Sequence, residues 1–328
     1  MSVTKGKVQI FACGGCGLNI GGMLEQHRGV DEPAFAELDI AFIDTSRSNL
    51  KAHINQDHCY FIDGLDGSGK VRSENHLEIQ NHIRAILQEF KPGDLNIVVS
   101  SAAGGSGSVL APLITKELLA NNAPVVVMTV GSAETRLDTE NTLKTLKSFA
   151  SIAEMTDAPV VMKYVQNSAE MTRKEADKHI FDAIMALAVL YSRQNHELDS
   201  KDLFNWLRFN RVTTFPVQLA SLYITESDEV LKQVGNVISV ATIAKEGMST
   251  TLPQMSEYQC VGFLPENASE AVSNRMPLHY VISDGIIPDV AKELQGILSK
   301  MESAQAARGR RTNIISDKDK ADGSGLVL

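Results

Sequence analysis

Nine small residues, 100–108 (SSAAGGSGS), lie between two apolar segments of different periodicity. The run at 95–99 is typical of a buried strand, and apolar residues recur at helical spacing over 109–120. Between a strand and a helix, glycines let backbone N–H groups approach an anion, and the helix N-terminus adds a partial positive charge. The segment predicts a phosphate site, with hydroxyl donors at Ser106 and Ser108. The alternative is a tight turn without a ligand.

A second glycine-rich segment, 13–19 (CGGCGLN), follows a strand-like run at 7–12 and precedes a helical stretch. Its two cysteines, Cys13 and Cys16, form a C-x-x-C pair that also raises a redox or zinc interpretation. The two remaining cysteines are isolated, which argues against a four-thiolate zinc site. A thioredoxin-like motif has its helix directly around the cysteines rather than three glycines. We therefore interpret the segment as a second phosphate loop.

An acidic residue, Asp44, ends the strand-like run at 39–43. In dinucleotide-binding folds, an acid at the end of the second strand holds the ribose, so an NAD-dependent oxidoreductase using Gly15, Gly17 and Asp44 is an alternative. The fingerprint is incomplete, because Ile20 stands where the third glycine or alanine belongs.

The segment 64–70 (GLDGSGK) nearly matches the phosphate loop G-x-x-x-x-G-K-[ST]. Val71 replaces the hydroxyl residue that would hold magnesium. The segment is therefore either a decoy or a different loop that touches the same nucleotide.

The elements that must position these residues alternate between strand and helix up to about residue 165. The strands are apolar throughout, which favours a parallel sheet covered on both faces. The stretch 173–195 reads as one long helix with a wide apolar surface, typical of a helix buried between two bodies. The later part predicts a small sheet and a final helix, with strands at 217–225, 237–243, 258–263 and 278–283 and the helix at 287–306.

Two acids, Asp199 and Asp202, follow the long helix. Taken alone, an acid at the N-cap and another three residues later are ordinary helix-start residues.

Charge and hydropathy limit the partners. The formal net charge of −9 argues against direct binding of nucleic acid, which needs clustered Lys and Arg. No apolar run reaches the roughly 18 residues of a membrane span, and the apolar run before Gly14 is shorter than we expect of a secretory signal. We expect a cytoplasmic protein with no membrane contact.

Taken in order, the segments 14–19, 103–108 and 198–203 resemble those of the tubulin and FtsZ superfamily, most closely its phage-encoded, PhuZ-type branch. The resemblance implies an α/β fold with a parallel, Rossmann-like GTPase sheet, a long central helix and a smaller α+β C-terminal domain. It implies a GTPase domain at 1–172, a central helix at 173–197, an activation domain at 198–286, and a C-terminal helix and flexible tail at 287–328.

The resemblance also implies that the chain binds GTP or GDP, with Mg²⁺ carried by the phosphates. The first loop would cradle phosphates, Glu134 would hold the ribose, and Asn167 and Asp177 would read the guanine edge. The positions that match the family's nucleotide contacts are Gly14, Gly15, Cys16, Gly17, Asn19, Asp44, Thr45, Gly67, Ser68, Gly69, Ala103, Gly104, Gly105, Ser106, Gly107, Ser108, Glu134, Arg136, Asn167 and Asp177.

Asp199 and Asp202 match the acidic pair that, in this family, acts on the nucleotide of the next subunit in a filament. The resemblance thus implies a self-assembling GTPase that positions phage DNA or a replication compartment in the cytoplasm of an infected bacterium. It also implies that the tail, 312–328, contacts an adjacent subunit. A structural polymer that binds GTP with little turnover is the second alternative.

Overall fold

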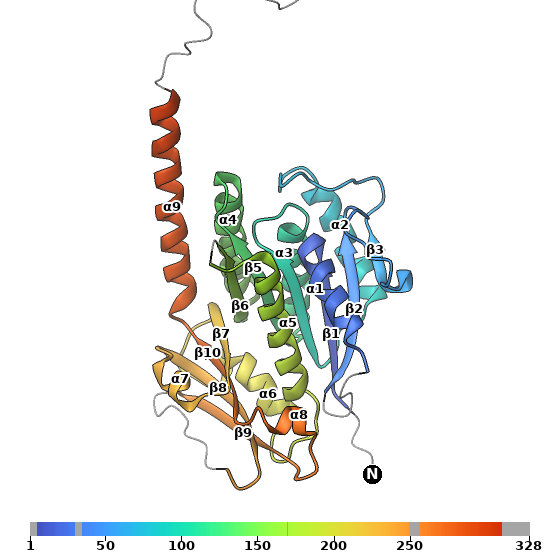
Figure 1. The fold of residues 1–328 in the computed structure, drawn as a ribbon, viewed down its shortest axis with the longest axis vertical. Helices are drawn as coiled ribbons and strands as arrows, with labels where there is room; N and C mark the ends of the chain where they lie inside the picture. Colours follow the sequence, from blue (N-terminus) through green and yellow to red (C-terminus); the bar gives the residue numbers. More distant parts are fainter. Residues whose placement is uncertain (1–4, 30–34, 169, 249–255, 310–328) are drawn as a thin grey trace, which may run out of the picture.

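The computed structural model describes residues 5–29, 35–168, 170–248 and 256–309 (Figure 1). Strands and helices alternate through the first part of the chain, as the apolar periodicity predicts. Its elements are β1 (Lys7–Cys13), α1 (Gly14–Gln26), β2 (Glu37–Asp44), β3 (Cys59–Phe61), α2 (His76–Glu89), β4 (Leu95–Ser101), α3 (Gly107–Ala120), β5 (Val125–Ser132), α4 (Arg136–Thr156) and β6 (Val160–Asn167).

A long helix, α5 (Arg173–Leu190), connects this part to the rest of the chain. Thr172 and Glu175 start it with a reciprocal capping box. The later elements are α6 (Ser200–Leu207), β7 (Leu219–Thr225), α7 (Asp228–Gln233), β8 (Val237–Lys245), β9 (Tyr258–Leu264), α8 (Glu270–Ser273), β10 (Leu278–Ser283) and α9 (Ile286–Gly309).

Within the described ranges, ten strands form one sheet in the order β3-β2-β1-β4-β5-β6-β7-β10-β8-β9. The strands from β3 to β7 pair in parallel, so their carboxyl ends lie at one edge. The strands expected to form a small sheet in the later part, β7 to β10, continue this same sheet beyond β6. Residues 160–162 of β6 pair with 219–221 of β7, and this pairing covers what would otherwise be an open strand edge.

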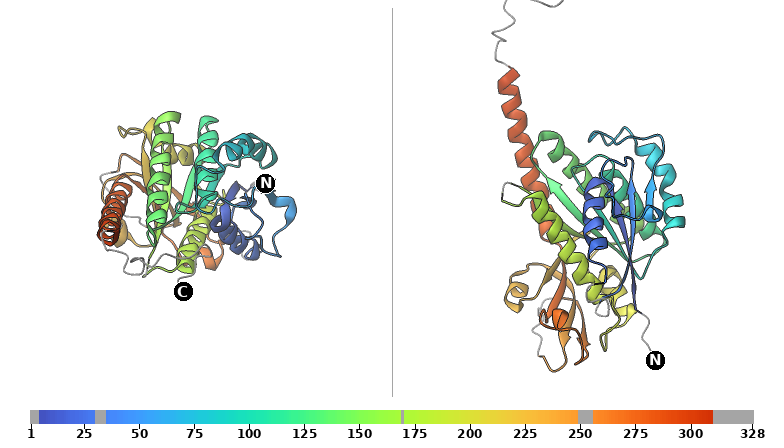
Figure 2. Two further views of the ribbon diagram at one scale, coloured as in Figure 1. Left: turned by 90° about the horizontal axis from the view of Figure 1, so that it is seen from above. Right: turned by 45° about the vertical axis from the view of Figure 1, so that its right-hand side comes forward.

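Helices cover both faces of the parallel part of the sheet (Figure 2). Side chains of α1 and α5 pack on one face, and those of α2, α3, α4 and the start of α9 pack on the other. This is the two-sided burial that uniformly apolar strands require. Among the described helices, none is both long and apolar enough to span a membrane.

The helix expected at 173–195 ends at Leu190. Its apolar surface is buried between the sheet and the later domain, as its width predicts. The early end has a backbone cause, because Arg193 takes a left-handed conformation (φ 58°) that a helix cannot continue.

The later domain is fixed to α5 by two aromatic side chains, Trp206 and Tyr280. The indole N–H of Trp206 donates to the backbone oxygen of Tyr280 at 3.2 Å, and the two rings meet edge to face. The hydroxyl of Tyr280 donates to the backbone oxygen of Ala186 in α5 at 2.6 Å. All three residues are buried.

Tyr280→Phe removes the hydrogen bond to Ala186 and keeps the ring. We expect a loss of about 1 kcal/mol in the free energy of unfolding, the usual contribution of one buried hydrogen bond. The fluorescence of Trp206, the chain's single tryptophan, reports the transition in a denaturant titration. The control Tyr223→Phe, on a half-buried ring, should change stability by less than about 0.5 kcal/mol. Equal effects of the two variants would contradict the assigned role of the Tyr280 hydroxyl.

Candidate functional site

Two adjoining cavities, of about 530 Å³ and 220 Å³, open at the carboxyl edge of the parallel strands. They share Cys16, Lys70, Ser101, Gly104 and Arg173 in their walls. Crevices at this edge of a parallel sheet are where such folds bind ligands. Both glycine-rich segments singled out in the sequence line the larger cavity.

The first of these segments is not a loop, contrary to expectation, because α1 begins directly at Gly14. A left-handed backbone at Gly14 (φ 68°) turns the chain from β1 into the helix. A β-carbon there would lie 2.8 Å from the backbone nitrogen of Gly107, and one on Gly107 would lie 2.7 Å from the carbonyl oxygen of Cys13. The close contact between the two glycine segments therefore requires glycine at both 14 and 107.

The helices α1 and α3 start in the wall of the larger cavity without a side-chain cap. In contrast, the hydroxyls of Thr135 and Thr172 cap α4 and α5. The first backbone N–H groups of a helix have no partner within it. Two uncapped helix starts in one cavity supply the donors and partial positive charge that bind a phosphate.

The segment 64–70 lies against the central glycine segment and lines the same cavity. A β-carbon on Gly105 would overlap the hydroxyl of Ser68, so the approach requires glycine. The side-chain amide of Asn75 donates to the carbonyl of Gly67 at 2.7 Å and holds the turn. The segment thus shares a cavity wall with both glycine-rich segments, and its role as a further ligand-contacting loop stays a prediction.

Asp44 brings a buried carboxylate into the larger cavity. Burial raises its pKa to about 6, although the backbone N–H groups of Thr45 and Ser46 oppose the shift. Thr45 does not line the cavity, but Ser106 does, and the hydroxyl of Thr45 is 2.5 Å from the hydroxyl of Ser106. Thr45 therefore positions Ser106.

The smaller cavity is lined by the polar side chains of Asn19, Asn167 and Asp177, which can hydrogen-bond to the edge of a heterocyclic ring. The thiol of Cys16 lies 3.7 Å from Asp177 Oδ1, and burial raises the pKa of both groups. The thiol therefore stays protonated at neutral pH, which disfavours the redox and zinc interpretations. Within the described ranges, no three His, Cys, Asp or Glu residues form a metal-binding group.

Glu134 stands outside the smaller cavity and orients two residues of its wall. It accepts from the amide of Asn167 at 3.0 Å and from the guanidinium of Arg173 at 2.7 Å, and these bonds lower its pKa. Arg173, which was not among the predicted site residues, lines both cavities. Its position four residues before Asp177 on α5, one helical turn away, was the available signal.

Three predicted contacts have other roles. A β-carbon on Gly17 would lie 2.6 Å from a backbone carbon of Ala12, so Gly17 lets α1 pack on the sheet. Ser108 is buried and donates to the carbonyl of Gly105 at 2.8 Å. Arg136 forms an ion pair with Glu140, with 2.8 Å between its guanidinium and the carboxylate, and does not line either cavity. The remaining predicted contacts that line a cavity are Gly15, Gly69, Ala103 and Gly104.

Asp199 and Asp202 lie at the start of α6, at the opposite end of α5 from the cavities (Figure 1). They form the helix-start pair that their spacing predicts. Asp199 Oδ1 accepts from the backbone of Lys201 and Asp202, which lowers the pKa of Asp199, and Asp202 Oδ2 accepts from the backbone of Asp199 at 3.1 Å. Capping leaves Asp199 exposed and Asp202 partly exposed.

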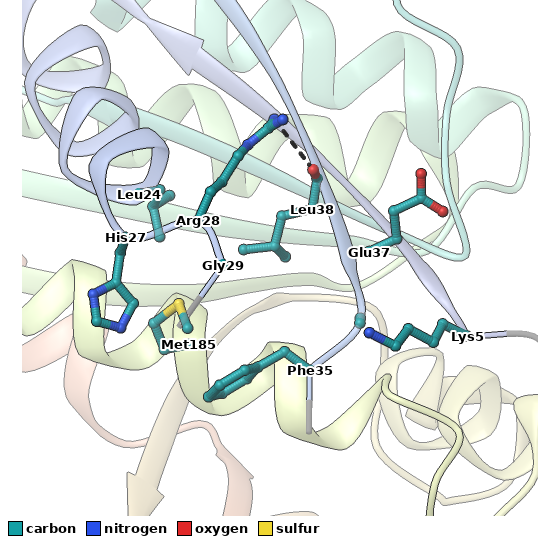
Figure 3. Close-up of a pocket in the computed structure, with 10 residues that line it drawn as sticks. Lys5, Leu24, His27, Arg28, Gly29, Phe35, Glu37, Leu38 and Met185 are labelled. Carbon is teal, nitrogen blue, oxygen red and sulfur yellow. Dashed lines mark hydrogen bonds between the residues drawn. The ribbon is translucent and has the colours of Figure 1, made fainter. Parts of the chain in front are cut away.

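A separate cavity of about 420 Å³ lies between the end of α1, the start of β2 and the middle of α5 (Figure 3). It contains no glycine-rich helix start. Its Arg28 donates to the carbonyl of Leu38 and pairs with Glu25, so this guanidinium is used within the wall. We assign the functional site to the glycine-lined cavities instead.

The fold and the site define a nucleotide-binding α/β protein. Residues 7–169 match the model of the "Tubulin/FtsZ family, GTPase domain", and 198–286 match that of the "Phage tubulin-like protein, C-terminal domain". Phage tubulin-like proteins of Pseudomonas phages phiKZ and PhiPA3 are each 28% identical to the chain, over 99% of it and 99–100% of their own length.

Solved structures agree. The "Protofilament of TubZ from Bacteriophage PhiKZ" has a TM-score of 0.85 at 26% identity, and the "phage tubulin PhuZ(SeMet)-GDP" has 0.85 at 24%; each match covers 98% of this chain and 99% of the other. The chain belongs to the tubulin/FtsZ family, with a C-terminal domain of the phage tubulin-like type. It is a GTPase of that family.

Asp44→Asn tests the buried carboxylate. Because the folded state raises the pKa of Asp44 to about 6, folding favours the neutral acid. Ionisation of Asp44 therefore lowers the free energy of unfolding. This destabilisation is absent below the unfolded pKa, grows as pH rises from about 4 to 6, and then stays constant. We expect the nucleotide-free variant to be more stable by about 1–3 kcal/mol at pH 7.5 and by less at pH 5, in denaturant titrations. A destabilised variant at pH 7.5 would contradict this.

Proposed function

We propose that this GTPase assembles into filaments and hydrolyses GTP where two subunits meet. The observation that carries the proposal is the separation of the acids from the cavity. The 18 residues of α5 span about 27 Å at 1.5 Å per residue, with the cavity at one end and Asp199 and Asp202 beyond the other. Stacking subunits along this axis would bring the acids of one subunit over the cavity of the next.

The chemistry supports a composite site. Phosphoryl transfer needs a positioned water and electrostatic stabilisation, and little covalent chemistry from the protein. The glycine segments, with Asn167 and Asp177, supply binding, and exposed carboxylates from a second subunit supply the group that orients water. Relatives described as "Protofilament of TubZ from Bacteriophage PhiKZ" and "PhuZ201 filament" support assembly.

Magnesium fits the larger cavity. Mg²⁺ prefers oxygen ligands and is usually held by substrate phosphates, one or two carboxylates and water. Asp44 and the hydroxyl of Ser106 bring oxygen atoms into the wall, and a carboxylate beside phosphates is unfavourable without a cation. The ion would neutralise phosphate charge.

Asp202→Asn separates capping from hydrolysis, because the amide keeps an acceptor oxygen. We expect GTP affinity within about threefold of wild type, intact filaments, and phosphate release slowed by about 10²-fold or more. Phosphate release and sedimentation are measured together. The matched control Glu229→Gln, on an exposed acid of α7, should leave the rate unchanged. Ordinary turnover by the Asp202 variant would leave the pair with a capping role alone.

The tail is proposed to bind a neighbouring subunit. Its sequence is mildly acidic, with Asp317, Asp319 and Asp322 interleaved with Lys318 and Lys320, and ends in Leu-Val-Leu. The helix α9 that precedes it extends beyond the body at the cavity end (Figure 1). A groove of about 860 Å³ between α2, α3 and α4 has matching chemistry, with Lys116 and Lys147 beside the exposed apolar Val71, Leu137 and Met155.

A chain ending at Gly309 should require about tenfold more protein to assemble, since a lost contact of about 1.4 kcal/mol changes an equilibrium tenfold. Lys147→Glu in the groove should raise the threshold of the full chain and leave that of the shortened chain unchanged. Light scattering over a concentration series gives both thresholds. Unchanged assembly of the shortened chain would rule out the tail contact.

In the cell, we propose that the filament positions phage DNA or a replication compartment in the cytoplasm of an infected bacterium. The phage origin of the relatives supports this role. The net charge of −9 favours an adaptor over direct DNA contact.

Light scattering with parallel phosphate release, in GTP, GDP, ATP and no nucleotide, tests the proposal as a whole. Scattering that rises with GTP above a threshold concentration and decays as phosphate appears is the expected result. Assembly without phosphate release would favour the structural polymer. A flat trace at high concentration would contradict GTP-driven assembly; the family match already rules out the NAD-dependent oxidoreductase.

A further inference from the structure

Lys70 lies where the two cavities meet and is the last residue of the P-loop-like segment 64–70. Its backbone is left-handed (φ 69°), a conformation that residues other than glycine rarely adopt. Its ammonium is 2.5 Å from Asp138 Oδ1, and its side chain stays 46% exposed. The side chain is therefore held at one point and open to the cavity elsewhere.

The partner, Asp138, is almost completely buried in the first turn of α4. Its other oxygen, Oδ2, accepts from the hydroxyl of Thr135 at 2.7 Å. A buried carboxylate needs a compensating charge, and Lys70 provides it. An ammonium has three N–H donors, so this ion pair leaves donors available on Lys70.

The backbone of Lys70 is fixed independently of its side chain. The amide of Asn141 donates to the carbonyl of Lys70 at 2.9 Å and to that of Ala103, in the central glycine segment, at 3.2 Å. Arg72, two residues on, bonds to the hydroxyl of Thr145 in α4. Replacing the Lys70 side chain should therefore leave the segment in place.

We propose that Lys70 donates to a phosphate oxygen of the bound guanine nucleotide and that Asp138 is its positioning residue. The inference rests on GTP binding in these cavities. A lysine held by a buried acid is a preorganised point charge, which the uncapped helix starts of α1 and α3 alone do not supply. The segment 64–70 would then resemble a phosphate loop in the use of its lysine, while lacking the hydroxyl that Val71 replaces.

The test measures the affinity of the full chain for GTP, GDP and guanosine below the assembly threshold. The variants are Lys70→Met, Asp138→Asn and the double variant, with Lys70→Arg as the charge-conserving control. We expect Lys70→Met to weaken GTP about tenfold or more and guanosine less than about threefold, since guanosine has no phosphate. Lys70→Arg should recover most of the loss. Thermal melts without nucleotide confirm that each variant is folded.

The double variant distinguishes a direct contact from simple neutralisation of Asp138. If Lys70 binds phosphate, the double variant stays at least about fivefold weaker for GTP than Asp138→Asn alone. Equal affinities of these two variants would overturn the proposal, and so would equal losses for GTP and guanosine in Lys70→Met. Failure of wild type to bind GTP would instead count against the nucleotide site itself.

Discussion

The rigidity of α5 is the constraint on which the rest of the structure depends. Its buried face fixes the sheet on one side and the later domain on the other, through Tyr280 and Trp206. Its first turns carry Arg173 and Asp177 into the cavity, and its last turn leads to α6. A buried helix of this length cannot fold its ends together, so one subunit cannot bring its acid pair to its own cavity.

The cavity itself supplies groups for binding a nucleotide but not the exposed acids. Backbone donors from two helix starts, a lysine held by Asp138 and a buried Asp44 suit binding of a phosphate chain with its cation. The acids that would orient water lie on another surface, with Asp199 exposed and Asp202 partly exposed. Under the proposed function this division would make hydrolysis depend on assembly, because the two sets of groups would meet only when subunits stack.

Local sequence patterns predicted much of the fold and of the cavity lining. Strand, glycine segment and helix recur twice, and the tight approach of Gly14 to Gly107 shows why no larger residue stands there. Two features set by distant parts of the chain could not be predicted: the pairing of β6 with β7 and the contact of Lys70 with Asp138. The ion pair of Arg136 with Glu140, in contrast, spans one turn of α4, so its spacing was visible in the sequence. The helix start at Gly14 was missed because a run of glycines predicts a loop. The roles assigned to the site residues stay predictions.

The composite site is tested most directly by mixing two inactive variants. Asp202→Asn leaves the cavity intact. Gly105→Val places a side chain against Ser68 and so blocks the cavity, but it leaves Asp202 in place. In mixed filaments, the acids of the second variant would sit over intact cavities of the first. We predict that each variant alone releases little phosphate and that the mixture recovers a rate well above the sum of the two. A mixture that only equals the sum, in filaments shown to contain both variants, would contradict a site shared between subunits.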